Sequence, residues 1–153
     1  MSFTHLHLLL NHLPVIGLLG VIVLLIVALK VRSDDISKLS LALLGVLSVI
    51  GLLTFLTGDP AAESIENLPG FSEAITERHE EFALIATILL GVCGAIATGV
   101  LIWARRKPLP RRAVAIVLVM SLLAGGTMGY TALLGGQVRH TEIRSDAVTT
   151  TED

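Results

Sequence analysis

Residues 82–104, FALIATILLGVCGAIATGVLIWA, form an uninterrupted run without a single Asp, Glu, Lys or Arg. About 20 apolar residues in a helix span the hydrocarbon core of a bilayer, so this stretch predicts a transmembrane helix. Three further charge-free stretches of similar length occur at residues 1–29, 39–58 and 113–138. The chain is therefore expected to be an integral membrane protein with four spanning helices.

The composition supports the same class. Of the 153 residues, 53% are hydrophobic, 16% are charged and only 4% are aromatic, and the mean hydropathy is +0.80. An average globular domain is about 25% charged, so an ordinary soluble domain, a disordered chain and a nucleic-acid binder are all excluded. We expect one domain, residues 1–145, followed by a flexible tail at 146–153.

The order of the apolar runs predicts the topology. Short basic loops follow the first and third runs, which makes helices one and two, and helices three and four, antiparallel neighbours. The expected fold class is an all-α, up-down-up-down bundle of four transmembrane helices, and Pro14 must kink the first helix or start it. The predicted helices cover about residues 4–31, 37–57, 72–105 and 112–140, with a short periplasmic helix at about 60–67.

Charge is sorted between the two ends of this bundle. The two loops near residues 30–38 and 105–112 hold 8 of the 11 Lys and Arg but only 2 of the 13 acids, a net charge of +6. The remaining polar segments carry a net charge of −8. The positive-inside rule places the basic loops in the cytoplasm and both termini on the periplasmic side of a bacterial inner membrane. The first helix is expected to be retained, because no basic segment precedes it and no signal-peptide cleavage site follows it.

Small residues recur at four-residue spacing in the last two helices. Gly91, Ala95 and Gly99 form one stripe, and Gly125 with Gly129 forms a GxxxG pattern. Such stripes let helix backbones approach closely, so they predict contact faces within the bundle or between copies in a homo-oligomer. The alternative is that the missing side chains leave room for a flat cofactor.

The histidines are the strongest functional signal in the sequence. All five lie at the acidic end, on three different helices, and none lies near a basic loop. His5 and His12 are seven residues apart and share a helix face, whereas His7 points elsewhere. His79 continues the apolar face of the third helix, and His140 continues a glycine-rich face of the fourth. An interfacial cluster of ionisable residues predicts a functional site.

Haem b is the leading interpretation of this cluster, because paired imidazoles from facing helices suit an electron-transfer haem. His12 with His79 is the first predicted pair, and His5 with His140 is the second, which allows two haems. Flanking arginines could bind the propionates, and small residues could admit the ring. The predicted haem-binding residues are His5, His12, His79, His140, Arg78, Arg139, Gly129 and Gly136, with Gly135 also offering room.

Two alternatives remain open. The first is a site for a zinc, copper or iron ion made by histidines and carboxylates. Its predicted ligands are His5, His7, His12, His79, His140, Glu63, Glu80 and Glu142, with Asp59 in the same layer. The second is an accessory subunit of a membrane complex that binds no cofactor. No HExxH motif, nucleophile–base pair or phosphate loop is present, so we expect no hydrolase or kinase activity, and the predicted partners are the lipid bilayer and a periplasmic or membrane redox protein.

Four short motifs carry a resemblance. Asn11-His12-Leu13-Pro14, Thr57-Gly58-Asp59-Pro60-Ala61-Ala62-Glu63, His79-Glu80-Glu81 and the segment GGQVRHTE at 135–142 occur in this order. They resemble the NHLP, TGxPAE, HEE and GGxxRHxE motifs of an uncharacterised family of bacterial four-helix membrane proteins, a domain of unknown function. Asp59 departs from this pattern, which often has Glu there. The resemblance implies the four-helix fold and the acidic end as the working end, and it implies no particular reaction.

Overall fold

The computed structural model describes residues 3–144, and every regular element within this range is helical. The elements are α1 (Phe3–Leu10), α2 (His12–Val31), α3 (Asp34–Leu56), α4 (Gly58–Glu63), α5 (Glu73–Trp103), α6 (Arg111–Arg139) and the 3-10 turn η1 (Thr141–Ile143). The predicted all-α class is therefore confirmed. The predicted tail at 146–153 lies outside the described residues.

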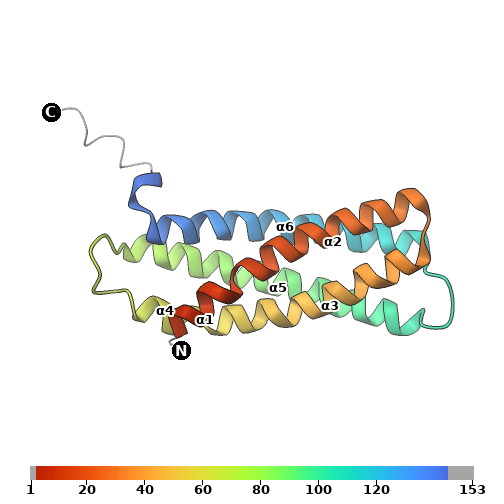
Figure 1. Cartoon of the computed structure of the whole chain (residues 1–153), viewed down its shortest axis with the longest axis horizontal. Coiled ribbons are helices and arrows are strands. Elements are labelled where there is room, and N and C mark those ends of the chain that lie inside the picture. Colours follow the sequence, from red (N-terminus) through yellow and green to blue (C-terminus); the bar gives the residue numbers. More distant parts are fainter. Residues whose placement is uncertain (1–2, 145–153) are drawn as a thin grey trace.

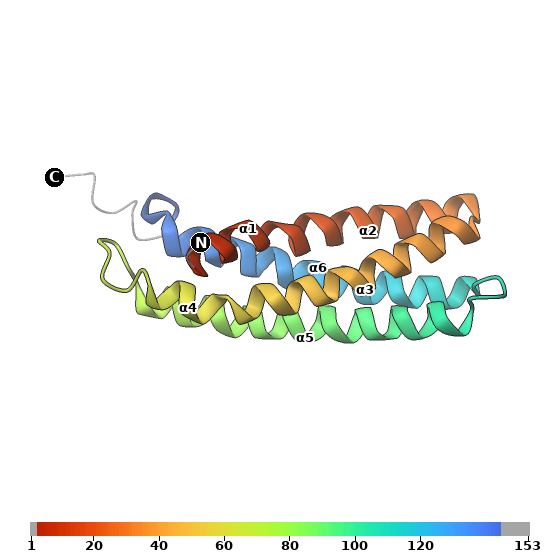
Figure 2. The same ribbon diagram turned by 60° about the horizontal axis from the view of Figure 1, so that its bottom comes forward.

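Four long helices lie side by side as a bundle (Figure 1, Figure 2). Both α2 and α5 pack against α3 and α6, so each long helix has two long neighbours. The loops of residues 32–33 and 104–110 lie at one end of the bundle, which we call the basic end. α1, α4, residues 64–72 and η1 lie at the opposite end, which we call the acidic end.

The bundle is apolar both inside and outside. Its centre is built from fully buried aliphatic side chains such as Leu25, Leu44 and Leu90. Large apolar side chains are also exposed along the outer faces, where Ile16 is 66% and Leu123 is 63% exposed. Such an exterior is unfavourable in water and suits a hydrocarbon environment. All four long helical segments are long and apolar enough to cross a membrane.

The predicted first helix, 4–31, is interrupted at Asn11, which separates α1 from α2. Pro14 explains the interruption, because it has no backbone N–H and its ring crowds the carbonyl four residues earlier. Asn11 keeps a helical conformation, and its N–H donates to the carbonyl of His7 at 2.9 Å. The helix is therefore interrupted without unravelling, and α1 contacts α3 and α4 as well as α2.

Two other helices begin earlier than predicted. α3 begins at Asp34 rather than at residue 37, because the Ser33 side chain accepts a hydrogen bond from the Ile36 N–H at 3.2 Å. The short helix covers Gly58–Glu63 rather than 60–67, and Thr57 holds its N-cap position. Successive turns then continue to Phe71.

The small-residue stripes mark the contact faces within the chain only in part: an added Cβ at Gly125 of α6 would lie 3.1 Å from the Ile22 Cδ1 atom of α2, but the other positions face outward. A Cβ atom added at Gly91, Gly99 or Gly129 would meet no other atom within 4 Å, and Ala95 is exposed. The close approach of α5 to α3 is instead at Gly94, where an added Cβ would collide with Ser48. Four-residue spacing identifies one face of a helix, but it does not tell whether that face points inward. Association between copies through the outward stripes stays a prediction.

Candidate functional site

His79 links two of the long helices near the acidic end. It lies on α5, is half-buried, and its Nδ1 is 3.0 Å from the Thr131 carbonyl oxygen of α6. The ring lies against Gly135, where an added Cβ would be only 3.0 Å from the His79 Cε1 atom. Gly135 therefore leaves room for the imidazole of His79, which fills the space that was predicted to admit a haem ring.

His7 makes a comparable link from α1. Its Nδ1 is 3.1 Å from the Thr54 carbonyl oxygen and 3.1 Å from the Thr57 Oγ1, both near the end of α3. The Thr57 hydroxyl itself donates to the Thr54 carbonyl at 2.7 Å. His7 is half-buried, while both threonines are buried. This polar cluster holds α1 against the end of α3.

These hydrogen bonds define the tautomer of both rings. A carbonyl oxygen only accepts, so Nδ1 must carry the hydrogen in His7 and in His79. In a neutral imidazole the lone pair then lies on Nε2, which is the atom that binds a metal. Within residues 3–144, neither Nε2 atom has a hydrogen-bond partner. Both rings lie toward the acidic end, one on α1 and one on α5 (Figure 1).

The other histidines face outward. His12 is exposed, and its Nδ1 is 3.3 Å from the Leu8 carbonyl oxygen of the preceding turn. His5 is exposed as well. His140 is exposed and lies 2.9 Å from Glu142 through its Nδ1. His12, the first predicted partner of His79, is therefore at the surface, and His7 is the residue near the N-terminus that reaches the bundle.

His5 and His12 are both exposed, so the face on which the sequence places them points away from the bundle. Helical periodicity groups residues on a face, but it does not tell whether that face points inward. The threonine partners of His7 and His79 were also missed, although Thr54, Thr57 and Thr131 are polar residues within apolar runs.

Carboxylates gather in a cleft between α4 and the first turns of α5. Phe71 and Thr76 also line this cleft, and Glu63 and Glu80 are the predicted metal ligands within it. The full set of acidic residues lining it is Asp59, Glu63, Glu66, Glu73, Glu77 and Glu80. Glu142, the third predicted carboxylate ligand, instead pairs with His140. Among residues 3–144, no group of three or more His, Cys, Asp or Glu is arranged to hold a metal ion.

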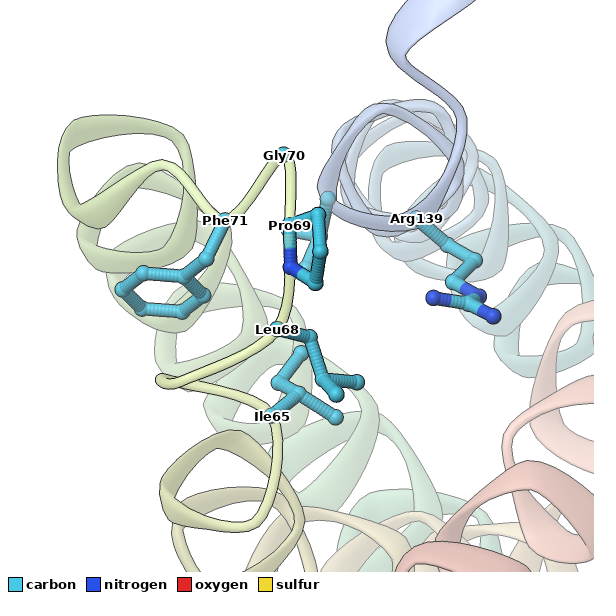
Figure 3. A pocket seen from close by; sticks show the side chains of 7 residues that line it. Ile65, Leu68, Pro69, Gly70, Phe71 and Arg139 are labelled. Atoms are coloured by element: carbon cyan, nitrogen blue, oxygen red, sulfur yellow. The ribbon is translucent and has the colours of Figure 1, made fainter.

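The predicted propionate partners have other contacts. Arg78 lies over the Tyr130 ring, with 5.9 Å between its Cζ and the ring centroid. Arg139 borders a small cleft formed with residues 65–71 (Figure 3). The space beside Gly136 is occupied by Ile143 of η1, which would lie 3.5 Å from an added Cβ. The open side of Gly129 is on the exposed surface.

No family model, curated protein or solved structure matches this chain. The interpretation of the acidic end therefore rests on its own geometry. Its two distinctive features are a pair of oriented imidazoles and a separate cleft lined by carboxylates. The imidazoles offer lone pairs to a ligand, whereas the carboxylates repel one another and give the end its negative charge.

Proposed function

We propose that this chain is a multi-pass protein of the bacterial cytoplasmic membrane that binds b-type haem at its acidic end and transfers electrons. In this proposal the helices run up-down-up-down, with the basic end in the cytoplasm and both termini on the periplasmic side. The observation that carries the haem assignment is the pair of half-buried imidazoles, His7 and His79.

The hydrogen bonds of these two rings suit metal ligation. A ligating histidine generally donates its second ring N–H to a carbonyl or a carboxylate, which fixes the orientation of the ring. His7 and His79 donate in this way to Thr54 and Thr131, and their Nε2 atoms remain available. The proposed pair keeps His79 from the prediction and replaces His12 with His7.

The number of available ligands favours haem over a bare ion. A structural zinc site takes about four protein ligands and a catalytic one about three. A low-spin haem needs only two axial histidines, because the porphyrin supplies the other four nitrogens. A haem held in this way supplies one-electron transfer and needs no substrate site. The negatively charged acidic end would then favour a positively charged redox partner.

Arg78 remains a candidate for binding a propionate. It precedes His79 directly in the sequence and is exposed, so its guanidinium can leave the Tyr130 ring and turn toward a carboxylate. Arg139 lies at the same end of the bundle, beside the small cleft of residues 65–71 (Figure 3). Arginine binds carboxylates through a planar fork of N–H groups, which makes either residue suitable.

An accessory subunit without a cofactor is the second candidate. The observation that favours it is that both histidines already tie helices together through their Nδ1 atoms. In that case the two rings act only as cross-links between α1 and α3 and between α5 and α6. Replacing them by another N–H donor would then preserve everything the protein does.

Optical spectroscopy separates the candidates. The protein is produced with ample haem, purified in detergent, and examined before and after dithionite; we expect a Soret band that shifts on reduction. His7→Ala and His79→Ala should lose the band, while His12→Ala and His140→Ala, which alter exposed rings, should keep it. His79→Gln retains an N–H donor, so it should lose haem yet keep the thermal stability of the helices.

Three outcomes would count against haem. Protein that is colourless and does not bind added hemin contradicts the proposal directly. Stoichiometric zinc, copper or iron by elemental analysis of that colourless protein would support the metal-ion alternative. A protein with neither, in which His79→Gln behaves as wild type, would support the accessory subunit.

A further inference from the structure

Positive charge at the basic end greatly exceeds the negative charge available there. Eight cationic residues lie in or beside the two loops, against only Asp34 and Asp35. The single ion pair at this end among residues 3–144 joins Lys38 to Asp34, with the Nζ and Oδ2 atoms 2.7 Å apart. Most of the cations must therefore be neutralised by something outside the chain.

Some of the cations have an internal role. The Arg111 guanidinium donates to the Leu29 carbonyl oxygen at 2.9 Å, at the end of α2. Lys107 lies over the Trp103 ring, with its Nζ 3.3 Å from the ring centroid. The other oxygen of the Asp34 carboxylate accepts a hydrogen bond from the Leu109 N–H at 2.7 Å. These contacts occupy the local carboxylate and order the loop.

Three arginines of the α5–α6 connection remain unused. Arg105, Arg106 and Arg112 are exposed and make no side-chain hydrogen bond or ion pair within residues 3–144. Their backbone is nevertheless well held, because Ala104, directly before Arg105, and Leu109, between Arg106 and Arg112, are buried. The three arginines thus lie between the end of α5 and the first turn of α6, on a backbone anchored by these two buried residues.

Apolar surface adjoins these arginines directly. Ile102 is 61% exposed and Trp103 is 58% exposed, at the last turn of α5. Tryptophan prefers the level of the lipid headgroups, and basic residues beside it attract anionic lipids. A ligand that fits both features has a phosphate group joined to an acyl chain. Free phosphate would use the arginines alone.

We propose that Arg105, Arg106 and Arg112 bind the phosphodiester headgroup of an anionic phospholipid whose acyl chains lie along Ile102 and Trp103. Arginine suits this ligand because its planar guanidinium donates two parallel hydrogen bonds to phosphate oxygens. The site lies at the end of the bundle opposite the histidines and does not depend on haem binding.

Trp103 provides a built-in reporter, because it is the only tryptophan in the chain. The full protein is placed in phosphatidylcholine bilayers containing phosphatidylglycerol that carries brominated acyl chains, and Trp103 fluorescence is measured. We expect stronger quenching than with an equal fraction of brominated phosphatidylcholine, and a decrease of the difference at high salt. Equal quenching by the two brominated lipids would overturn the proposal.

A pair of variants with the same loss of charge tests the location. Arg105→Gln/Arg106→Gln should reduce the preference for phosphatidylglycerol by on the order of tenfold, since each basic residue near an anionic surface contributes several-fold in affinity. The control, Lys30→Gln/Lys38→Gln, removes two charges from the neighbouring loop and should keep most of the preference. Equal losses in the two variants would overturn the site in favour of diffuse surface charge.

Competition identifies the source of the phosphate. Inorganic phosphate and glycerol phosphate are added to the bilayers, and we expect neither to restore the fluorescence quenched by brominated phosphatidylglycerol. Full recovery with inorganic phosphate would overturn the lipid assignment in favour of a free anion. Circular dichroism of each variant should show unchanged helix content, so that a loss of quenching reports the site.

Discussion

The two ends of the bundle close their helices in different ways. At the basic end, α2 and α3 are joined by two residues, with Arg32 in a left-handed conformation at φ 57° and Ser33 capping α3. Asp34 and Arg111 then tie the α2–α3 loop to the α5–α6 loop. At the acidic end, the single connection between long helices, from α3 to α5, is longer, and two histidines bond backbone carbonyls across helices. One end is closed by local capping, and the other keeps ring nitrogens available for a ligand.

The largest expected effect comes from filling the space that His79 uses. In Gly135→Val the new side chain would collide with the imidazole, because even a Cβ lies 3.0 Å from its Cε1. We expect a loss of about 2 kcal/mol in the free energy of unfolding, as is typical of an overpacked position. The haem band should disappear with it.

Gly129→Val is the matched control, since it lies on the same helix with nothing within 4 Å of an added Cβ. Thermal unfolding in detergent, followed by circular dichroism, and the absorption spectrum measure both effects. If both valine variants unfold at the same temperature and keep the same spectrum, the role given to Gly135 is wrong.

The next effect tests the connection between loops at the basic end. Asp34→Ala leaves the Leu109 N–H without its acceptor and removes the ion pair with Lys38. We expect a loss of about 1.5 kcal/mol, mostly from the unsatisfied N–H group. Asp35→Ala removes an exposed neighbouring acid and should cost far less, and urea or SDS titrations of the two variants would make the comparison.

A smaller effect compares helix caps at the two ends. The Ser33 side chain caps α3, whereas Ser72 holds the same position before α5 without a side-chain capping bond. We expect Ser33→Ala to destabilise the fold by about 1 kcal/mol and Ser72→Ala by much less. The thermal unfolding midpoints of the two variants measure this difference. A larger decrease for Ser72→Ala than for Ser33→Ala would show that the Ser33 cap does not have the predicted effect.

The smallest effect concerns the exposed pair beyond α6. The pKa of the Glu142 carboxyl is lowered by a hydrogen bond from its own backbone N–H and, second, by the His140 ring. His140→Ala should therefore raise that pKa only part of the way to its ordinary value. A carboxyl group whose pKa is lowered by folding stabilises the fold at pH values above its ordinary pKa. This small contribution is lost as the pH falls through the pKa of the folded state.

NMR titration of the Glu142 side-chain carboxyl carbon measures this change, and His12→Ala serves as the control at the same end. The titration of Glu142 should be unaltered in that control, because His12 bonds only within its own segment. A full return of the Glu142 pKa to its ordinary value in His140→Ala would mean that the backbone bond matters less than the ring.

The fold was predictable because the helices follow from a one-dimensional property. Charge-free runs of sufficient length need no knowledge of neighbours, and the sorting of Lys and Arg separates the two ends. The site required three-dimensional information. The packing of α1 on α3 and α4 decides that His7 reaches the bundle, and η1 decides that Ile143 covers Gly136. Neither follows from helical periodicity, since both depend on contacts between different elements.

The docking of α1 also constrains the order in which the helices assemble during synthesis. α1 rests on α3 and α4, and His7 bonds Thr54, so the first eight helical residues are completed by a segment synthesised some fifty residues later. Until the second long helix has emerged and returned to the acidic end, the N-terminal segment has no partner. The earliest part of the chain thus waits for segments made later, and the proposed haem site, which also needs His79 of α5, can assemble only after that helix has been made.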